Sequence, residues 1–249
     1  MDIPVIFAQS GRGDEIRSLT LPEGRCIPSS DSADVPLSEA IAALPRTESR
    51  QPVVIADWGS IRSRRFEEGV VKGMKVRGRD IWLMIWIEDA DDLMDAFNTV
   101  ADTVMAPLHA ISGEEDLKDI CSLSDSVIPT VFCTGGRAMG MGSRRSDLTE
   151  VVPDLVDMGF YRICVVDPDD SVDAETWDII RDICPSCMPL VSDRSIAKDF
   201  ADAIVPLRLR SLPLGTPPRH PGRLPCRPCP SRRPPDGPTT PSPAWPRTP

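Results

Sequence analysis

The sequence lacks long apolar runs and has few aromatic residues and only two histidines. The absence of any 18-residue apolar stretch argues against a membrane-spanning helix. Eight cysteines in 249 residues are too sparse for a disulfide-rich miniprotein, and glycine does not recur every third residue as in collagen. The opening MDIPVIFAQS carries an acid and one short apolar run, unlike a signal peptide. We therefore expect a cytoplasmic protein with reduced thiols and no membrane partner.

Charge and proline are distributed unevenly along the chain. Residues 1–205 hold 20 basic and 37 acidic side chains, a net charge of −17. Residues 206–249 hold eight arginines, no lysine, one acid and 15 of the 27 prolines. Frequent proline prevents regular helices and sheet ladders, so we expect one acidic folded domain over 1–205 and a disordered tail over 206–249. The negative domain should repel phosphates, and we expect no nucleic-acid partner.

Two interpretations of the Pro/Arg-rich tail stay open. It could be a disordered basic arm that binds acidic partners or aromatic-lined grooves. Alternatively, the abrupt change in composition, with arginine but no lysine, is typical of a GC-rich gene read out of frame. Under the first interpretation, the whole chain could be a non-catalytic acidic scaffold whose arm recruits partners.

Short apolar runs alternate with helical patterns through residues 1–205. The predicted strands are Ile3–Phe7, Val53–Asp57, Ile81–Ile87, Thr103–Ala106, Ile128–Cys133, Arg162–Asp167, Met188–Ser192 and Ala203–Leu207. The predicted helices are Leu37–Leu44, Asp89–Thr99, Glu114–Leu123, Asp147–Met158 and Ala174–Ile183. Such alternation predicts βαβ units with a parallel sheet, and eight strands favour a (β/α)8 TIM-barrel-like fold. Because the eighth strand meets the change in composition, we expect a disrupted last unit.

Four segments carry a resemblance to a known family: Ile3–Ile6, Val54–Ile61, Val131–Arg137 and Gly159–Asp167. Their order resembles the HisA/HisF-like ribulose-phosphate-binding barrels of histidine biosynthesis, particularly the archaeal members. The resemblance spans residues 3–205 and rests on order and spacing, since no single motif is specific.

The resemblance implies an isomerase with two acids, one ending the first strand and one ending the fifth. Here those positions are Phe7 and Phe132, which cannot transfer a proton. The family's glycine-rich phosphate turns are also replaced, by Trp86–Asp89 after the third strand and Val191–Arg194 after the seventh. We therefore expect a HisA/HisF-like protein that binds a small phosphorylated or anionic metabolite without the isomerase chemistry. Whether it is an enzyme stays open.

Polar residues at predicted strand ends are the candidate site residues. Asp57, His109 and Asp167 could serve a metal-dependent enzyme, because carboxylate oxygens suit a hard cation and histidine can act as a base near neutral pH. The alternative is that each of the three side chains stabilises its own loop. Gly135, Gly136 and Arg137 are candidate ligands for an anion through backbone N–H groups and a guanidinium. The alternative for these is a simple turn.

Two CxxC pairs, Cys184–Cys187 and Cys226–Cys229, suggest a zinc or dithiol site. The 38 residues between the pairs exceed the usual spacing of a zinc site, and the second pair lies in the tail. The sequence identifies no cofactor.

Overall fold

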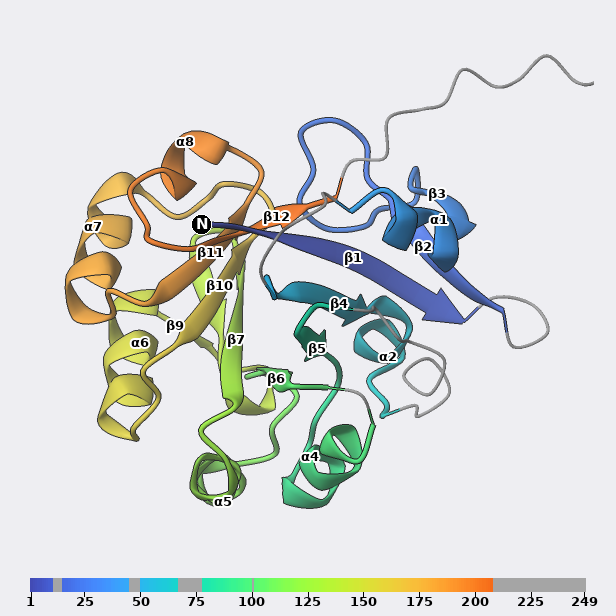
Figure 1. Cartoon of the computed structure of the whole chain (residues 1–249). Coiled ribbons are helices and arrows are strands. Elements are labelled where there is room, and N and C mark those ends of the chain that lie inside the picture. Colours follow the sequence, from blue (N-terminus) through green and yellow to red (C-terminus); the bar gives the residue numbers. More distant parts are fainter. Residues whose placement is uncertain (11–14, 45–49, 67–77, 100, 208–249) are drawn as a thin grey trace, which may run out of the picture. The chain divides into compact units, whose positions relative to one another are not determined.

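A computed structural model of the chain has a mixed α/β fold (Figure 1). The structure describes residues 1–10, 15–44, 50–66, 78–99 and 101–207. Among these residues, eight strands each pair in parallel with at least one neighbour. They are β1 (Asp2–Ser10), β4 (Val53–Asp57), β5 (Ile81–Met84), β6 (Thr103–Pro107), β7 (Val127–Thr134), β10 (Ile163–Asp167), β11 (Cys187–Val191) and β12 (Ala203–Pro206).

The parallel strands are paired in chain order, from β1 through β4, β5, β6, β7 and β10 to β11. The last strand, β12, returns to the first, with Asp2 opposite Ala203 and Val5 opposite Pro206. β1 also pairs in parallel with β4, and there Val5 is opposite Val54. β11 and β12 lie side by side, but no ladder joins them within the described part of the chain.

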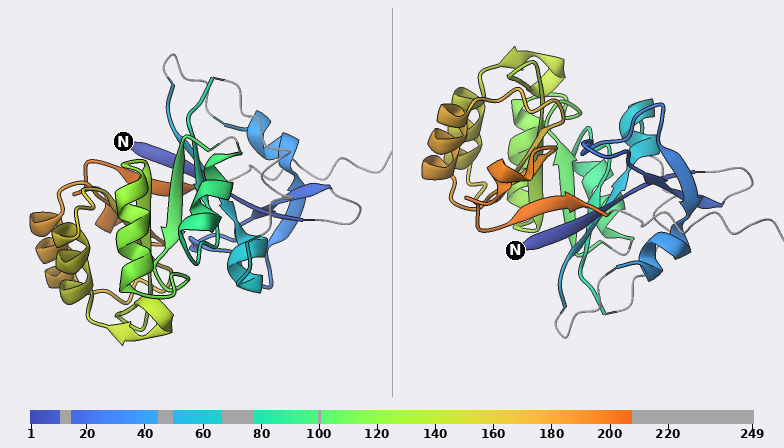
Figure 2. Two further views of the ribbon diagram at one scale, coloured as in Figure 1. Left: turned by 90° about the horizontal axis from the view of Figure 1, so that it is seen from below. Right: turned by 90° about the horizontal axis from the view of Figure 1, so that it is seen from above.

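Helices follow most of the parallel strands in the chain and flank the sheet (Figures 1 and 2). They are α1 (Leu37–Ala42), α2 (Trp58–Ser63), α4 (Ala90–Phe97), α5 (Glu114–Leu123), α6 (Leu148–Asp157), α7 (Ala174–Ile183) and α8 (Arg194–Ala197). Short antiparallel strands extend the sheet at two places. β2 (Ile16–Thr20) and β3 (Ala33–Pro36) continue from β1, and β8 (Arg137–Met139) and β9 (Arg145–Ser146) form a hairpin after β7.

Alternate residues of each parallel strand enter different apolar clusters, because successive side chains of a strand point to opposite faces. On β1, Val5 and Phe7 belong to an inner cluster, whereas Ile6 packs in an outer cluster with Leu37 of α1. All eight parallel strands contribute to the inner cluster. Representative members are Ile3, Val54, Met84, Met105, Ile128, Cys164, Met188 and Ile204. Burial on both faces explains why these strands are nearly continuous apolar runs.

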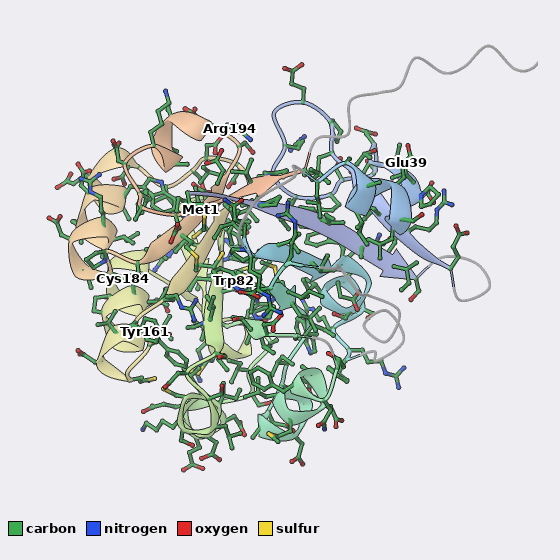
Figure 3. All side chains as sticks on the ribbon, viewed as in Figure 1. Met1, Glu39, Trp82, Tyr161, Cys184 and Arg194 are labelled. Atoms are coloured by element: carbon green, nitrogen blue, oxygen red, sulfur yellow. The ribbon has the colours of Figure 1, made fainter. Side chains whose placement is uncertain are left out.

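The predicted α/β class, with parallel strands alternating with helices, is confirmed. The strand Val53–Asp57 and the helices Glu114–Leu123 and Ala174–Ile183 have the predicted bounds. The strand predicted over Ile81–Ile87 is three residues too long, since β5 ends at Met84. Trp82 packs against the inner cluster and lies centrally among the strands (Figure 3).

The eighth strand is formed, although we expected a disrupted last unit. β12 extends to Pro206, past the change in composition, and Leu207 N–H donates to Val5 O at 2.9 Å. Residues 208–249, including the Cys226–Cys229 pair, lie outside the described residues. Both interpretations of the tail therefore stay open. Within the described segments, no helix is both long and apolar enough to cross a membrane.

Candidate functional site

Asp57 ends β4 and is completely buried, where it caps the following helix. Its Oδ1 accepts a hydrogen bond from Ser60 N–H at 3.0 Å. The Ser60 hydroxyl donates to Asp57 O at 3.1 Å and accepts from Trp86 N–H at 3.1 Å. This network ties the end of β4 to the segment after β5, which is the loop-stabilising role that we held open for Asp57.

Asp167 ends β10 and is also completely buried. Its Oδ1 accepts from Ser171 N–H at 3.1 Å and from the Ser171 hydroxyl at 3.0 Å, and its Oδ2 accepts from Val172 N–H at 2.9 Å. Burial raises the pKa of Asp167 above its ordinary value, and the hydrogen bond with the Asp169 carboxyl raises it further. The carboxyl therefore organises the loop between β10 and α7.

His109 follows β6 and lies between two aromatic rings. Its ring centroid is 5.4 Å from that of Trp86 and 5.2 Å from that of Phe132, with edge-to-face geometry in both cases. Burial is the larger cause, and the positive charge of Arg64 the smaller one, that together lower the pKa of His109 to about 4. Nδ1 is buried, and it has no hydrogen-bond partner among the described residues. At neutral pH the imidazole is therefore uncharged.

The neutral imidazole makes stability depend on pH. Because the unfolded chain binds a proton near pH 6.5 and the folded one only near pH 4, the free energy of unfolding should fall as pH drops through this window. Between pH 7 and pH 5, the free energy of unfolding of His109→Gln should therefore decrease by about 1–2 kcal/mol less than that of the wild type, allowing for partial exposure of the ring. Urea unfolding of the wild type and of His109→Gln at pH 7 and at pH 5 measures this difference. Parallel pH profiles would contradict the prediction.

The three candidate catalytic residues are not grouped as the ligands of a metal ion among the described residues. Asp57, His109 and Asp167 follow β4, β6 and β10, no two of which are neighbours in the sheet. Across the described ranges, no three His, Cys, Asp or Glu side chains are grouped to hold a metal ion. The metal-dependent hypothesis thus receives no support from the geometry.

The candidate anion ligands after β7 are engaged by the chain itself. Gly135 N–H donates to Asp169 Oδ2 at 3.2 Å, and Gly136 N–H donates to the Ser171 hydroxyl at 2.7 Å. Arg137 forms an ion pair with Asp147 at 3.3 Å. An incoming anion would have to displace a carboxylate of the protein, so these contacts favour the alternative of a turn.

Gly136 occupies a conformation that other residues rarely adopt, with φ of +75°, and an added Cβ would lie 3.1 Å from Ser171 O. We expect Gly136→Ala to lower the free energy of unfolding by about 2 kcal/mol. Gly135→Ala is the matched control. Its φ is +58° but nothing lies within 4 Å of an added Cβ, so its loss should be about 1 kcal/mol. Thermal denaturation compares them, and equal losses would refute the steric argument.

The cysteines of the first CxxC pair are poorly suited to metal or redox chemistry. Cys184 and Cys187 are buried free thiols. Burial raises the pKa of both, most strongly for Cys187. Since the thiolate is the nucleophile of dithiol chemistry, these thiols lack the activation that a redox role requires. Among the described residues, no group of three His, Cys, Asp or Glu side chains suited to a metal ion includes them.

A polar groove that the sequence did not reveal lies at the carboxyl ends of β1 and β4. Its volume is about 340 Å3, and its lining residues are Gln9, Ser10, Gly59, Arg62 and Ser63. The register that sets Ala8 opposite Asp57 brings these two segments together. Among the residues that the structure describes, none that lines the groove is acidic, and the lining carries one positive charge, that of Arg62.

The two strand positions that we aligned with catalytic acids on the basis of the resemblance hold buried aromatic residues. Phe7 is 2% exposed and meets Trp58 edge to face at a centroid distance of 5.6 Å. Phe132 is 8% exposed and contacts His109. Neither ring can exchange a proton.

Comparison with known proteins does not assign a family. No protein-family model matches the chain, and no curated protein matches it either.

Proposed function

We propose that this chain is a HisA/HisF-like barrel protein that binds a small phosphorylated or anionic metabolite in the groove between β1 and α2. The observation that carries the proposal is the exposed guanidinium of Arg62 in a groove whose described lining residues include no acid. The groove lies at the carboxyl ends of parallel strands, where α/β proteins place their ligands.

The lining offers donors that suit a phosphate or carboxylate. Arg62 is exposed in the last turn of α2, and it forms no ion pair with any residue that the structure describes. The Ser10 hydroxyl can donate one hydrogen bond, and a guanidinium can bind an anion through two. The Ser63 hydroxyl already donates to Ser60 O at 3.3 Å and would have to turn from it to reach a ligand. The Gly59 backbone has no side chain to obstruct a ligand, and an added Cβ would meet Asp57 Oδ1 at 3.2 Å.

A closed (β/α)8 barrel is part of the proposal. It is supported by the inner cluster, to which all eight parallel strands contribute, and by the pairing of the last strand with the first. The proposal excludes the family's isomerase chemistry, because Phe7 and Phe132 occupy the positions of the two acids.

Calorimetric titration with inorganic phosphate, a sugar phosphate and the unphosphorylated sugar tests the binding. We expect both phosphates to bind and the free sugar not to bind. Arg62→Gln should weaken phosphate binding about tenfold, since a hydrogen bond to a charged group contributes roughly 1.5–3 kcal/mol. Arg62→Lys, which keeps the charge, should recover part of the affinity.

Arg65→Gln is the matched control, because Arg65 is an exposed arginine of the same segment that does not line the groove. It should leave the affinity for phosphate unchanged. No measurable binding of either phosphate, or an equal loss in the Arg62 and Arg65 variants, would overturn the proposed function.

A further inference from the structure

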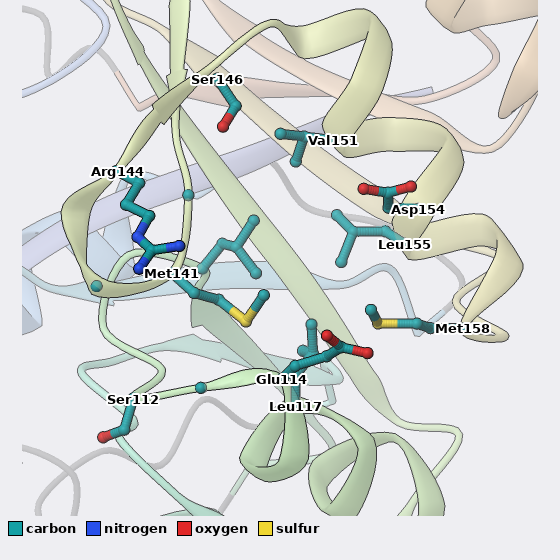
Figure 4. A pocket seen from close by; sticks show the side chains of 14 residues that line it. Ser112, Glu114, Leu117, Met141, Arg144, Ser146, Val151, Asp154, Leu155 and Met158 are labelled. Atoms are coloured by element: carbon teal, nitrogen blue, oxygen red, sulfur yellow. The ribbon is translucent and has the colours of Figure 1, made fainter.

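A second cavity lies between α5, α6 and the β8–β9 hairpin (Figure 4). Its volume is about 550 Å3, within the usual range for small-molecule sites. The apolar part of its lining is Leu108, Leu117, Met141, Val151, Leu155 and Met158. Two thioethers make this wall adaptable, because methionine side chains adjust readily to the shape of a ligand.

Opposite charges stand on different sides of the apolar wall. Arg144 projects from the hairpin, whereas Asp154 of α6 and Glu114 of α5 lie on the helical side, with Met141 and Leu155 between them (Figure 4). Glu114 is already neutralised by Lys118, at 2.6 Å. Among the described residues, neither the Arg144 guanidinium nor the Asp154 carboxylate has an ion-pair partner. The cavity thus presents one unpaired cation and one unpaired anion.

The hairpin turn holds Arg144 in place. Gly140 N–H donates to Arg144 O at 2.7 Å, and Arg144 N–H donates to Met141 O at 3.4 Å. Between them Gly142 has φ of +60°, a left-handed conformation that glycine adopts without strain. The arginine that flanks the cavity is therefore fixed by its backbone even though its side chain is exposed.

We propose that this cavity binds a small molecule with an apolar body, an anionic group at one end and a cationic group at the other, as in an apolar dipeptide. The anionic end would pair with Arg144 and the cationic end with Asp154. A simple anion would face the unpaired Asp154 carboxylate, and a simple cation would face the Arg144 guanidinium, so neither matches the lining as well. The apolar body would cover the wall of leucine, valine and methionine side chains.

This site is independent of the metabolite groove. The two cavities share no lining residue. Leu108 lines the second cavity and belongs to an apolar cluster with Leu117 of α5 and Leu155 of α6, and no residue that lines the groove belongs to that cluster. Failure of one proposal therefore leaves the other unaffected.

Titration of the full chain with leucyl-leucine, its N-acetyl form and its C-terminal amide tests the proposal. We expect the unmodified dipeptide to bind about three- to fivefold more tightly than either modified form, which is the usual contribution of an exposed ion pair. Arg144→Gln should abolish the preference over the amide, and Asp154→Asn the preference over the N-acetyl form. Shifts of the Met141 and Met158 methyl resonances should locate the ligand.

Matched controls separate a specific ion pair from the general field of the protein. Arg145→Gln and Asp157→Asn change neighbouring exposed charges that do not line the cavity, and both should keep the wild-type preferences. Circular dichroism should show that all four variants are folded. Equal binding of the three dipeptide forms, identical effects of the Arg144 and Arg145 variants, or no binding at millimolar dipeptide would each overturn the proposal.

Discussion

Replacing Phe7 with alanine should lower the free energy of unfolding by about 4 kcal/mol, the largest single effect that we expect. The ring is 2% exposed, belongs to the inner cluster and packs edge to face against Trp58. Its removal loses apolar contact and leaves a cavity that strands fixed by ladders on both sides cannot easily collapse to fill.

Urea denaturation of the wild type and the variant measures this loss. Phe7→Leu is the control, because it keeps most of the buried volume, and it should cost about 1 kcal/mol. If the alanine variant lost no more than the leucine variant, Phe7 could not be a central element of the inner cluster.

Replacing Asp167 with alanine should cost about 3 kcal/mol, because it leaves the N–H groups of Ser171 and Val172 without their acceptor. The price of leaving a buried donor unpaired is larger than the net gain from forming its hydrogen bond. Thermal unfolding gives the difference directly.

Asp169→Ala is the matched control, since Asp169 lies two residues farther along the same loop but is exposed. It accepts hydrogen bonds from Gly135 N–H at 3.2 Å and from the Ser171 hydroxyl at 2.9 Å. Water can replace Asp169 at these donors, so we expect a loss of about 1 kcal/mol or less. Equal losses for the two variants would show that burial of Asp167 contributes nothing.

The parallel strands could be predicted because their sequences are continuous apolar runs, which only a doubly covered sheet buries. The antiparallel additions could not. β3 contains Asp34 and Pro36, and β8 begins with Arg137, so neither has an apolar pattern. These strands are specified by partners in the sheet, β2 and β7, and not by their own composition.

Some features of the candidate site could likewise be predicted from the sequence, and others could not. The strand-end positions of Asp57 and Asp167 were predictable, because an acid directly after an apolar strand must lie near its end. Their hydrogen bonds were not, because they depend on the path of the next loop. The groove around Arg62 joins two segments about 50 residues apart in the sequence, and only the register of β1 with β4 brings them together.

The pairing of the first strand with the last has a consequence for how the chain is made. During synthesis, the edge of β1 that receives Ala203–Pro206 stays bare until nearly the whole described sequence has left the ribosome. A bare strand edge is a template for strands of other molecules. Nascent chains should therefore be most prone to aggregation late in translation, and truncation before Ala203 should yield protein that associates instead of folding.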